Sequence, residues 1–142
     1  MKNIYLTAIV CSFLLLCGCS KDFLKSYDKR IVGTWEITDV NRVGIGGSTS
    51  DLPFRDGTFT FNEDGSATYT NTAGVLYKGS WDIDKKNIDD ENVRRSLQVT
   101  VVDFVSQRIL TEYYDDMNFT STNRFKANIM SSFHTYVTHF RR

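Results

Sequence analysis

The chain has 142 residues, of which 41% are hydrophobic and 13% aromatic. This length suits about one globular domain, and the composition excludes collagen-like, linker-like and disordered chains. The 17 basic and 17 acidic side chains give a formal net charge of +0. This balance argues against nucleic-acid binding, which usually requires a basic surface.

The chain begins with a segment that predicts export. Residues 4–17 (IYLTAIVCSFLLLC) are apolar or small without interruption and follow a short start that contains Lys2. A transmembrane helix needs ~20 residues to cross the hydrocarbon core, so this run is too short to span a bilayer. A basic start before a short apolar run is typical of a secretory signal peptide.

The end of this run, residues 16–19 (LCGC), resembles the lipobox of bacterial lipoproteins. The resemblance implies that residues 1–18 are removed as a signal peptide and that Cys19 is acylated, so that lipid at Cys19 anchors the protein to a membrane. Ser20 follows in place of the Asp that would retain a lipoprotein at the inner membrane. The resemblance therefore implies the outer membrane of the cell envelope and leaves open the periplasmic or the surface face.

The distribution of cysteine agrees with export. All three cysteines, Cys11, Cys17 and Cys19, lie in the first 19 residues, so the rest of the chain has no thiol that could mispair. The alternative is a metal or redox pair of Cys17 and Cys19. That pair lacks the second pair of Cys or His ligands that a zinc site needs.

Residues 19–30 are expected to form an acylated tether with one short helical turn, because Phe23, Leu24 and Tyr27 share a helical spacing. From residue 31 onward, alternating apolar and polar residues predict strands. We expect strands at 31–43, 58–62, 66–72, 75–83, 97–103, 108–114, 118–126 and 133–141. We expect a long loop at 44–56, a charged loop at 84–95 and a turn at 127–132.

Eight short strands in sequence predict an all-β domain over residues 31–142, either a barrel or a sandwich. We favour an eight-stranded antiparallel up-and-down barrel, because closure removes the free strand edges that would pair with other chains. Such a barrel is either filled with side chains or holds one small ligand.

The segment Gly33-Thr34-Trp35 resembles the lipocalin G-x-W signature, in which the Trp packs across one end of the barrel. Residues 58–66 (TFTFNEDGS) and 77–83 (YKGSWDI) are similar to lipocalin-like lipoproteins of Gram-negative, Bacteroidetes-type bacteria. The resemblance implies a cavity for a small hydrophobic or amphipathic ligand. It also implies a late basic residue, Arg141 or Arg142, packed against Trp35. The second lipocalin signature, of the T-D-Y type, is absent.

Five aromatic side chains are candidates for contact with such a ligand: Trp35, Phe59, Tyr69, Tyr77 and Trp81. A role in the core competes with this interpretation, because a buried aromatic side chain removes ~150–250 Å² from water. The loop at 44–56 has two interpretations as well, a mobile lid over the barrel mouth or a plain connection.

No pattern predicts catalysis, a metal or a cofactor. His134 and His139 are five residues apart on an expected strand, so they face opposite sides. Ser132 and His134 share a face but lack a nucleophile elbow and an orienting acid. Two function classes remain: a membrane-anchored binding module for a small apolar or amphipathic ligand, or an envelope module that binds or inhibits another protein through a filled barrel.

Overall fold

The computed structural model describes residues 25–89 and 92–142. A short helix, α2 (Tyr27–Ile31), precedes the strands, and a 3-10 helix, η2 (Thr49–Asp51), lies in the loop after the first strand. The described part contains nine strands: β1 (Gly33–Gly44), β2 (Thr58–Phe61), β3 (Ser66–Thr70), β4 (Leu76–Asn87), β5 (Val93–Asp103), β6 (Arg108–Tyr114), β7 (Asp116–Ser121), β8 (Arg124–Met130) and β9 (His134–Arg141). Neither helix is long and apolar enough to cross a membrane. The predicted signal peptide and the predicted acylation of Cys19 lie outside the described residues.

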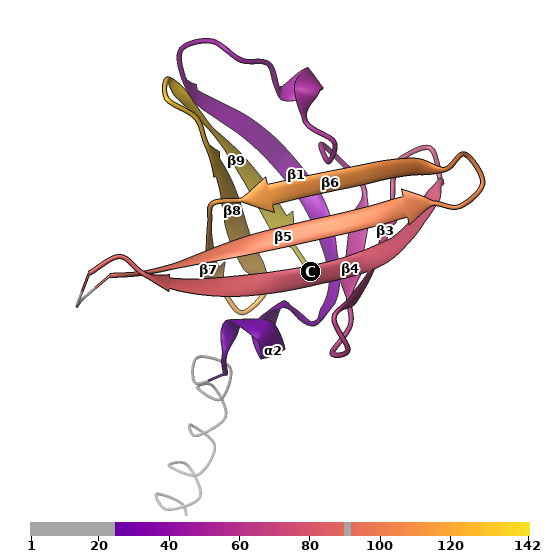
Figure 1. Cartoon of the computed structure of the whole chain (residues 1–142), viewed down its shortest axis with the longest axis horizontal. Coiled ribbons are helices and arrows are strands. Elements are labelled where there is room, and N and C mark those ends of the chain that lie inside the picture. The colour runs from indigo at the N-terminus through magenta and orange to yellow at the C-terminus, as the bar shows by residue number, and fades with distance from the viewer. Residues whose placement is uncertain (1–24, 90–91) are drawn as a thin grey trace, which may run out of the picture.

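All nine strands belong to one antiparallel sheet, in the order β6-β5-β4-β3-β2-β1-β9-β8-β7 (Figure 1). The predicted all-β antiparallel fold is therefore confirmed. Two finer features of the prediction are wrong. The described part has nine strands instead of eight, and the sheet is not closed into a barrel, because β6 and β7 are free edges.

The sheet stays open because the chain bends between its two edge strands, which are separated only by Asp115. Before the bend β6 pairs with β5, and after it β7 pairs with β8. Asp115 Oδ2 accepts a hydrogen bond from the backbone N of Met130 at 2.7 Å, which ties the bend to the end of β8. The sheet rolls until β7 contacts β5 and β8 contacts β6. The edges thus approach each other without forming a ladder.

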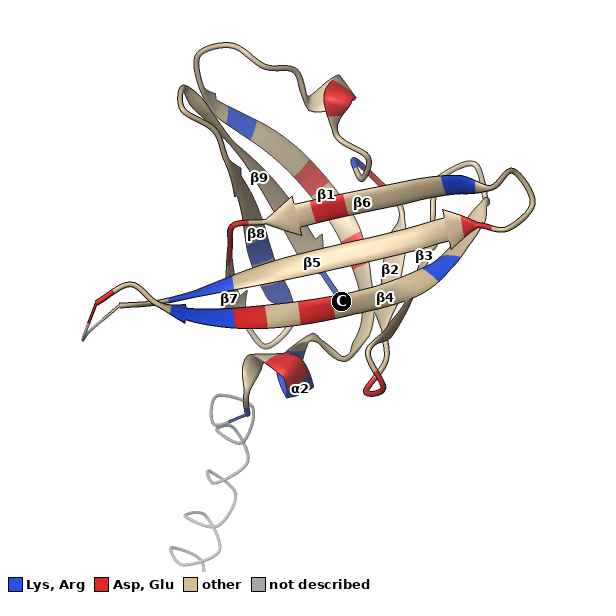
Figure 2. Ribbon diagram, in the orientation of Figure 1, with Lys and Arg blue, Asp and Glu red and all other residues tan. Residues whose placement is uncertain are grey.

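The segment 84–95, predicted as a charged loop, is mostly a hairpin. The β4–β5 ladder runs on to the pair Asn87↔Val93. Figure 2 shows basic residues along this end of the hairpin. The prediction failed because side chains on both faces are exposed here, so the sequence has no apolar alternation, while the backbone ladder needs none.

The expected strand at 118–126 is wrong as well, because the chain turns in its middle. β7 and β8 form a hairpin in which Ser121 pairs with Arg124. The side chain of Ser121 accepts a hydrogen bond from the backbone N of Asn123 at 3.3 Å, a local contact that favours a turn. The predicted turn at 127–132 accordingly shrinks, since β8 continues to Met130.

Aromatic rings fill the inside of the rolled sheet. Phe125 and Phe140 stack with centroids 4.2 Å apart, and Phe59 stacks on Phe61 at 5.3 Å. The largest fully buried side chains are Trp35, Tyr114, Phe54, Phe59, Phe61, Phe125, Phe140, Ile31, Leu97, Val99, Val101 and Thr138. Burial of apolar surface contributes ~25 cal/mol per Å², so these rings supply much of the driving force for folding.

Trp35 packs at the α2 end of the sheet, beneath the last residue of the chain. Its ring edge contacts Phe125 at 4.8 Å, and its Nε1 donates a hydrogen bond to the carbonyl of Ile31 at 2.6 Å. The guanidinium of Arg142 lies 4.6 Å from the ring centroid. The expected packing of a late arginine on Trp35 is confirmed, and the residue is Arg142. The predicted short helical turn before the first strand is also confirmed, as α2.

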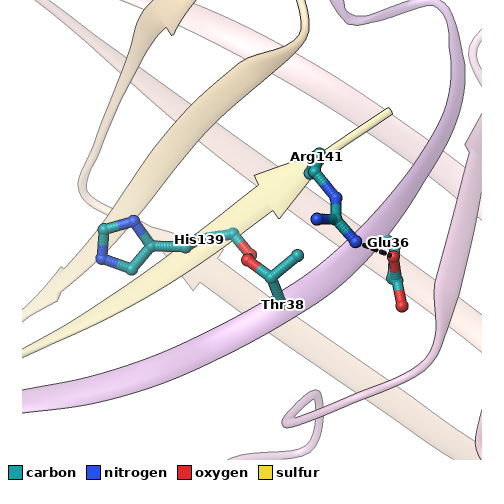
Figure 3. Close-up of polar contacts among 4 residues, drawn as sticks. All are labelled: Glu36, Thr38, His139 and Arg141. Atoms are coloured by element: carbon teal, nitrogen blue, oxygen red, sulfur yellow. Dashed lines mark hydrogen bonds and ion pairs between the residues drawn. The ribbon is translucent and has the colours of Figure 1, made fainter.

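Arg141 makes a different contact, on the outer face of the sheet (Figure 3). Its Nη2 donates to Glu36 Oε2 at 3.0 Å across the β1–β9 pair. In the same view Thr38 Oγ1 donates to the carbonyl of His139 at 3.2 Å, while the His139 ring points away from this ion pair.

Candidate functional site

A cavity of about 230 Å³ opens at the end of the sheet opposite α2. Three parts of the chain form its wall: the segment between η2 and β2, the β3–β4 hairpin near its turn, and the start of β6. The side chains that line it are Pro53, Arg55, Asp56, Tyr69, Asn71, Thr72, Tyr77, Arg108 and Leu110. We call this the loop-end cavity.

Two tyrosines form the inner wall of the loop-end cavity because of strand register. Tyr69 on β3 is the direct partner of Tyr77 on β4, so both side chains lie on the same face of the sheet. Their ring centroids are 5.6 Å apart. Both rings are almost completely buried, with 2% and 3% of their surface exposed.

The segment after η2 is fixed against these tyrosines. Tyr69 donates a hydrogen bond from its hydroxyl to the carbonyl of Asp56 at 2.9 Å. Phe54 is buried and packs its ring edge on Phe59 and Tyr69, each at 4.9 Å. Gly57 has φ +87° and approaches so closely that a Cβ there would lie 2.4 Å from the carbonyl O of Thr70. The second half of the loop at 44–56 is therefore packed against the sheet and forms part of the cavity wall.

The two tyrosine hydroxyls differ in their hydrogen bonding. Burial, reinforced by the nearby Asp56 carboxylate, raises the pKa of Tyr69 to about 12. Tyr69 therefore stays protonated at neutral pH and keeps its bond to the Asp56 carbonyl. Tyr77 lines the same cavity, yet its hydroxyl has no hydrogen-bond partner among the described residues. This hydroxyl is not among the unpaired atoms that are shut off from water, so it is free to bond to water or to a ligand.

Two arginines stand at the rim of the loop-end cavity. Arg55 comes from the segment before β2 and Arg108 from the first position of β6, and both are exposed. Neither forms an ion pair or a hydrogen bond within residues 25–89 and 92–142. The carboxylate of Asp56 is the single acidic group of the lining. The side chains that line the cavity therefore carry more hydrogen-bond donors than acceptors, and more positive than negative charge.

Of the five aromatic residues predicted for ligand contact, only Tyr69 and Tyr77 line the loop-end cavity. Trp35 and Phe59 lie in the core, where 0% and 1% of their surface is exposed. Trp81 lies at the α2 end, where it borders a shallow hollow of about 550 Å³, and its Nε1 donates to the carbonyl of Asn62 at 3.1 Å. A ligand contact for all five side chains in one site does not fit this arrangement.

The sequence interpretation missed Arg55 and Arg108. Both stand beside an expected strand, in the loop at 44–56 and at the start of the strand at 108–114. That position is the only signal in the sequence, because their approach depends on how far the sheet rolls. Alternation along single strands does not specify the roll.

The described part shows no constellation for metal chemistry. No three His, Cys, Asp or Glu side chains within it lie close enough together to hold a metal ion. His134 packs its ring edge against Tyr136 at 4.8 Å, and His139 lies further along β9.

Comparison of the chain with protein-family models, curated proteins and solved structures finds no significant match. The function proposed below accordingly depends on the residues and geometry of this chain.

Proposed function

We propose that this protein is an acylated, lipocalin-like envelope lipoprotein that binds a small amphipathic molecule in the loop-end cavity. The observation that carries the proposal is that a tyrosine hydroxyl without a protein partner and two exposed, unpaired arginines line one concavity. A few convergent polar groups typically orient a ligand in its site, and the lining of this cavity is mainly polar.

The packing of the interior favours this position over the centre of the rolled sheet. Lipocalin resemblance implies a ligand among the inward-facing rings, but Phe59, Phe61, Phe125 and Phe140 occupy that space in mutual contact. A ligand there would have to displace close-packed rings, which costs several kcal/mol of packing. The loop-end cavity needs no such rearrangement.

The position of the cavity also suits a tethered protein. α2 lies at one end of the sheet, and the β3–β4 turn lies at the other (Figure 1). Acylation at Cys19 would place lipid six residues before Lys25, a span of at most ~20 Å. The α2 end would then face the membrane, and the loop-end cavity would open away from it.

The binding proposal is tested by blocking the cavity. Thr72→Trp places a large ring in the lining, and Thr122→Trp places the same ring in the exposed β7–β8 turn at the far end. The wild type and both variants are purified from membranes and compared by native mass spectrometry. A small molecule should be found on the wild type and on Thr122→Trp but not on Thr72→Trp. Equal retention by all three proteins would contradict the cavity as the site.

The anchor is tested separately by labelling cells with radioactive palmitate. The label should remain with the wild-type polypeptide through denaturation and be lost from Cys19→Ala. An absence of label on the wild-type chain would contradict the lipoprotein part of the proposal. It would not bear on ligand binding in the cavity.

A second candidate function is an interaction module with a filled interior. Large apolar side chains are exposed at the tips of two hairpins: Phe104 and Val105 between β5 and β6, at 74% and 96%, and Phe133 between β8 and β9, at 79%. Exposed apolar groups of this kind are found at protein-binding surfaces. Crosslinking in intact envelopes would favour this candidate if Phe104→Ser or Phe133→Ser removed a specific adduct that Thr72→Trp retained.

A further inference from the structure

We propose that the loop-end cavity recognises a small oxyanion, with the guanidinium groups of Arg55 and Arg108 and the hydroxyl of Tyr77 as donors. The inference rests on the proposed function, because it names the chemical class of ligand for the same cavity. It is carried by the lining residues and by the hydrogen bonds that they leave unmade.

The charges of the rim favour an anion. Arg55 and Arg108 come from distant parts of the chain and both line the cavity, where one carboxylate, that of Asp56, opposes two guanidinium groups. No acidic side chain of the described part forms an ion pair with either arginine. An anion in the cavity would therefore meet two guanidinium groups that have no other charged partner there. A cation would meet two positive groups for one negative group.

The remaining polar groups of the wall are donors. Asn71 accepts a hydrogen bond from the backbone N of Val75 at its Oδ1, at 2.9 Å, which leaves its Nδ2 group available to donate. The hydroxyl of Tyr69 already donates its hydrogen bond to the Asp56 carbonyl. Tyr77 keeps its proton available, with only 3% of its surface exposed. A donor that lines the cavity and has no protein partner fits a ligand oxygen.

The geometry of arginine narrows the class to oxyanions. A guanidinium group presents a planar fork of N–H donors that matches the two oxygens of a carboxylate or a phosphate. The cavity volume of about 230 Å³ equals roughly eight water molecules at ~30 Å³ each. It therefore suits a small organic acid or a free phosphate ion.

The test uses isothermal titration of the mature protein, purified from membranes, with three probes: benzoate, the neutral analogue benzamide, and inorganic phosphate. We expect benzoate to bind at least about tenfold more tightly than benzamide, because hydrogen bonds to a charged group contribute more than neutral ones. Benzoate without phosphate would identify an organic acid as the ligand. Phosphate without benzoate would identify the inorganic ion.

Variants assign the effect to the proposed donors. Arg55→Gln and Arg108→Gln should each weaken oxyanion binding about tenfold, and Tyr77→Phe should weaken it by a smaller factor. Arg94→Gln is the matched control, because it removes the same charge from an exposed arginine at the far end of β5 and should change nothing. Far-ultraviolet circular dichroism confirms that each variant is folded.

The outcomes separate this inference from the proposed function. Equal binding of benzamide and benzoate, blocked by Thr72→Trp but unchanged by Arg55→Gln and Arg108→Gln, would overturn the oxyanion inference and keep the cavity as a binding site. Oxyanion binding that Arg94→Gln weakens as much as Arg55→Gln and Arg108→Gln do, and that Thr72→Trp leaves unchanged, would overturn both, since it would reflect overall charge.

Discussion

Arg141 and Arg142 are neighbours in the chain, yet their side chains make different contacts. Arg142 covers the ring of Trp35 at 4.6 Å and donates to the carbonyls of Val32 at 3.2 Å and Thr122 at 3.0 Å. It thereby joins the start of β1 to the β7–β8 turn. Arg141 forms one ion pair with Glu36 in which both side chains are more than half exposed.

We expect Arg142→Ala to lower the free energy of unfolding by about 1–2 kcal/mol, because it removes a cation–π contact and three charge-assisted hydrogen bonds. Arg141→Ala removes the same charge and should cost less than about 0.5 kcal/mol, as exposed ion pairs usually do. Urea unfolding of both variants measures the difference. Equal losses would mean that net charge, and not the packing on Trp35, explains the effect.

Among the elements, the end of the β4–β5 hairpin has an unusual arrangement of charge. Lys85 pairs directly with Arg95, and Lys86 with Arg94 (Figure 2). Like charges that face each other across a ladder repel and destabilise the pair. The guanidinium of Arg95 lies 4.0 Å from the ring centroid of Tyr27, which offsets part of this cost on one face. Within the described residues, the other face, with Lys86 and Arg94, has no such contact.

Lys86→Glu should therefore stabilise the protein by ~0.3–1 kcal/mol, because it replaces repulsion by an opposite-charge pair with Arg94. Lys78→Glu is the control: it makes the same charge change on the same strand opposite Thr68 and Val102, which are uncharged. Thermal unfolding in low and high salt checks the prediction. The gain should shrink in high salt, since screening weakens exposed pairs. An equal gain from both variants would contradict the pairwise explanation.

A comparison of β2 and β3 with the end of the β4–β5 hairpin shows where the sequence predicts strands and where it does not. β2 and β3 were predicted to within two residues, because Phe59, Phe61, Ala67 and Tyr69 alternate with polar neighbours. The described residues at 84–89 and 92–94 are exposed on both faces, so a paired segment has the composition of a loop. Alternation measures one-sided burial, and where burial ends it no longer reports pairing.

The candidate site was predictable only in part, for a related reason. Register parity placed Tyr69 and Tyr77 on the inner face, and the structure agrees. Arg55 and Arg108 could not be placed together, because their proximity follows from the roll of the whole sheet. The break after Tyr114 was predicted, since the expected strand ended there, but alternation carries no sign that this bend leaves the sheet unclosed.

At the scale of the whole molecule, an open sheet must protect its edges from other chains. On the edge strand β6, Glu112 shares the inward-facing side with Leu110 and Tyr114, both buried. A charge on the inner face of an edge strand discourages further strand pairing. The placement has a cost, because burial raises the pKa of Glu112 above its ordinary value of 4.5, and the nearby Asp115 adds to the effect.

Two turn carboxylates have the opposite shift. The pKa of Asp103 lies below its ordinary value of 3.8, because its carboxylate accepts hydrogen bonds from the Ser106 hydroxyl and the Val105 backbone N. The pKa of Asp64 is lowered by Ser66 in the same way. Each group stabilises the fold above pH 3.8, and this contribution is lost as the pH falls through its lowered pKa.

These shifts predict opposite pH dependences for two conservative variants. The charged form of Glu112 is disfavoured in the folded state, so its penalty is present at neutral pH and disappears as the pH falls through its raised pKa to below 4.5. Glu112→Gln should therefore raise the melting temperature by a few degrees at pH 7 and have no effect near pH 4. Asp103→Asn should lower it at pH 7, and its deficit should close only well below pH 3.8. Calorimetry of both variants and the wild type between pH 2 and 8 measures the two differences. If the gain in melting temperature from Glu112→Gln persisted at pH 3, it would come from packing or from strand propensity. Burial of a charge on the open edge would then no longer explain it.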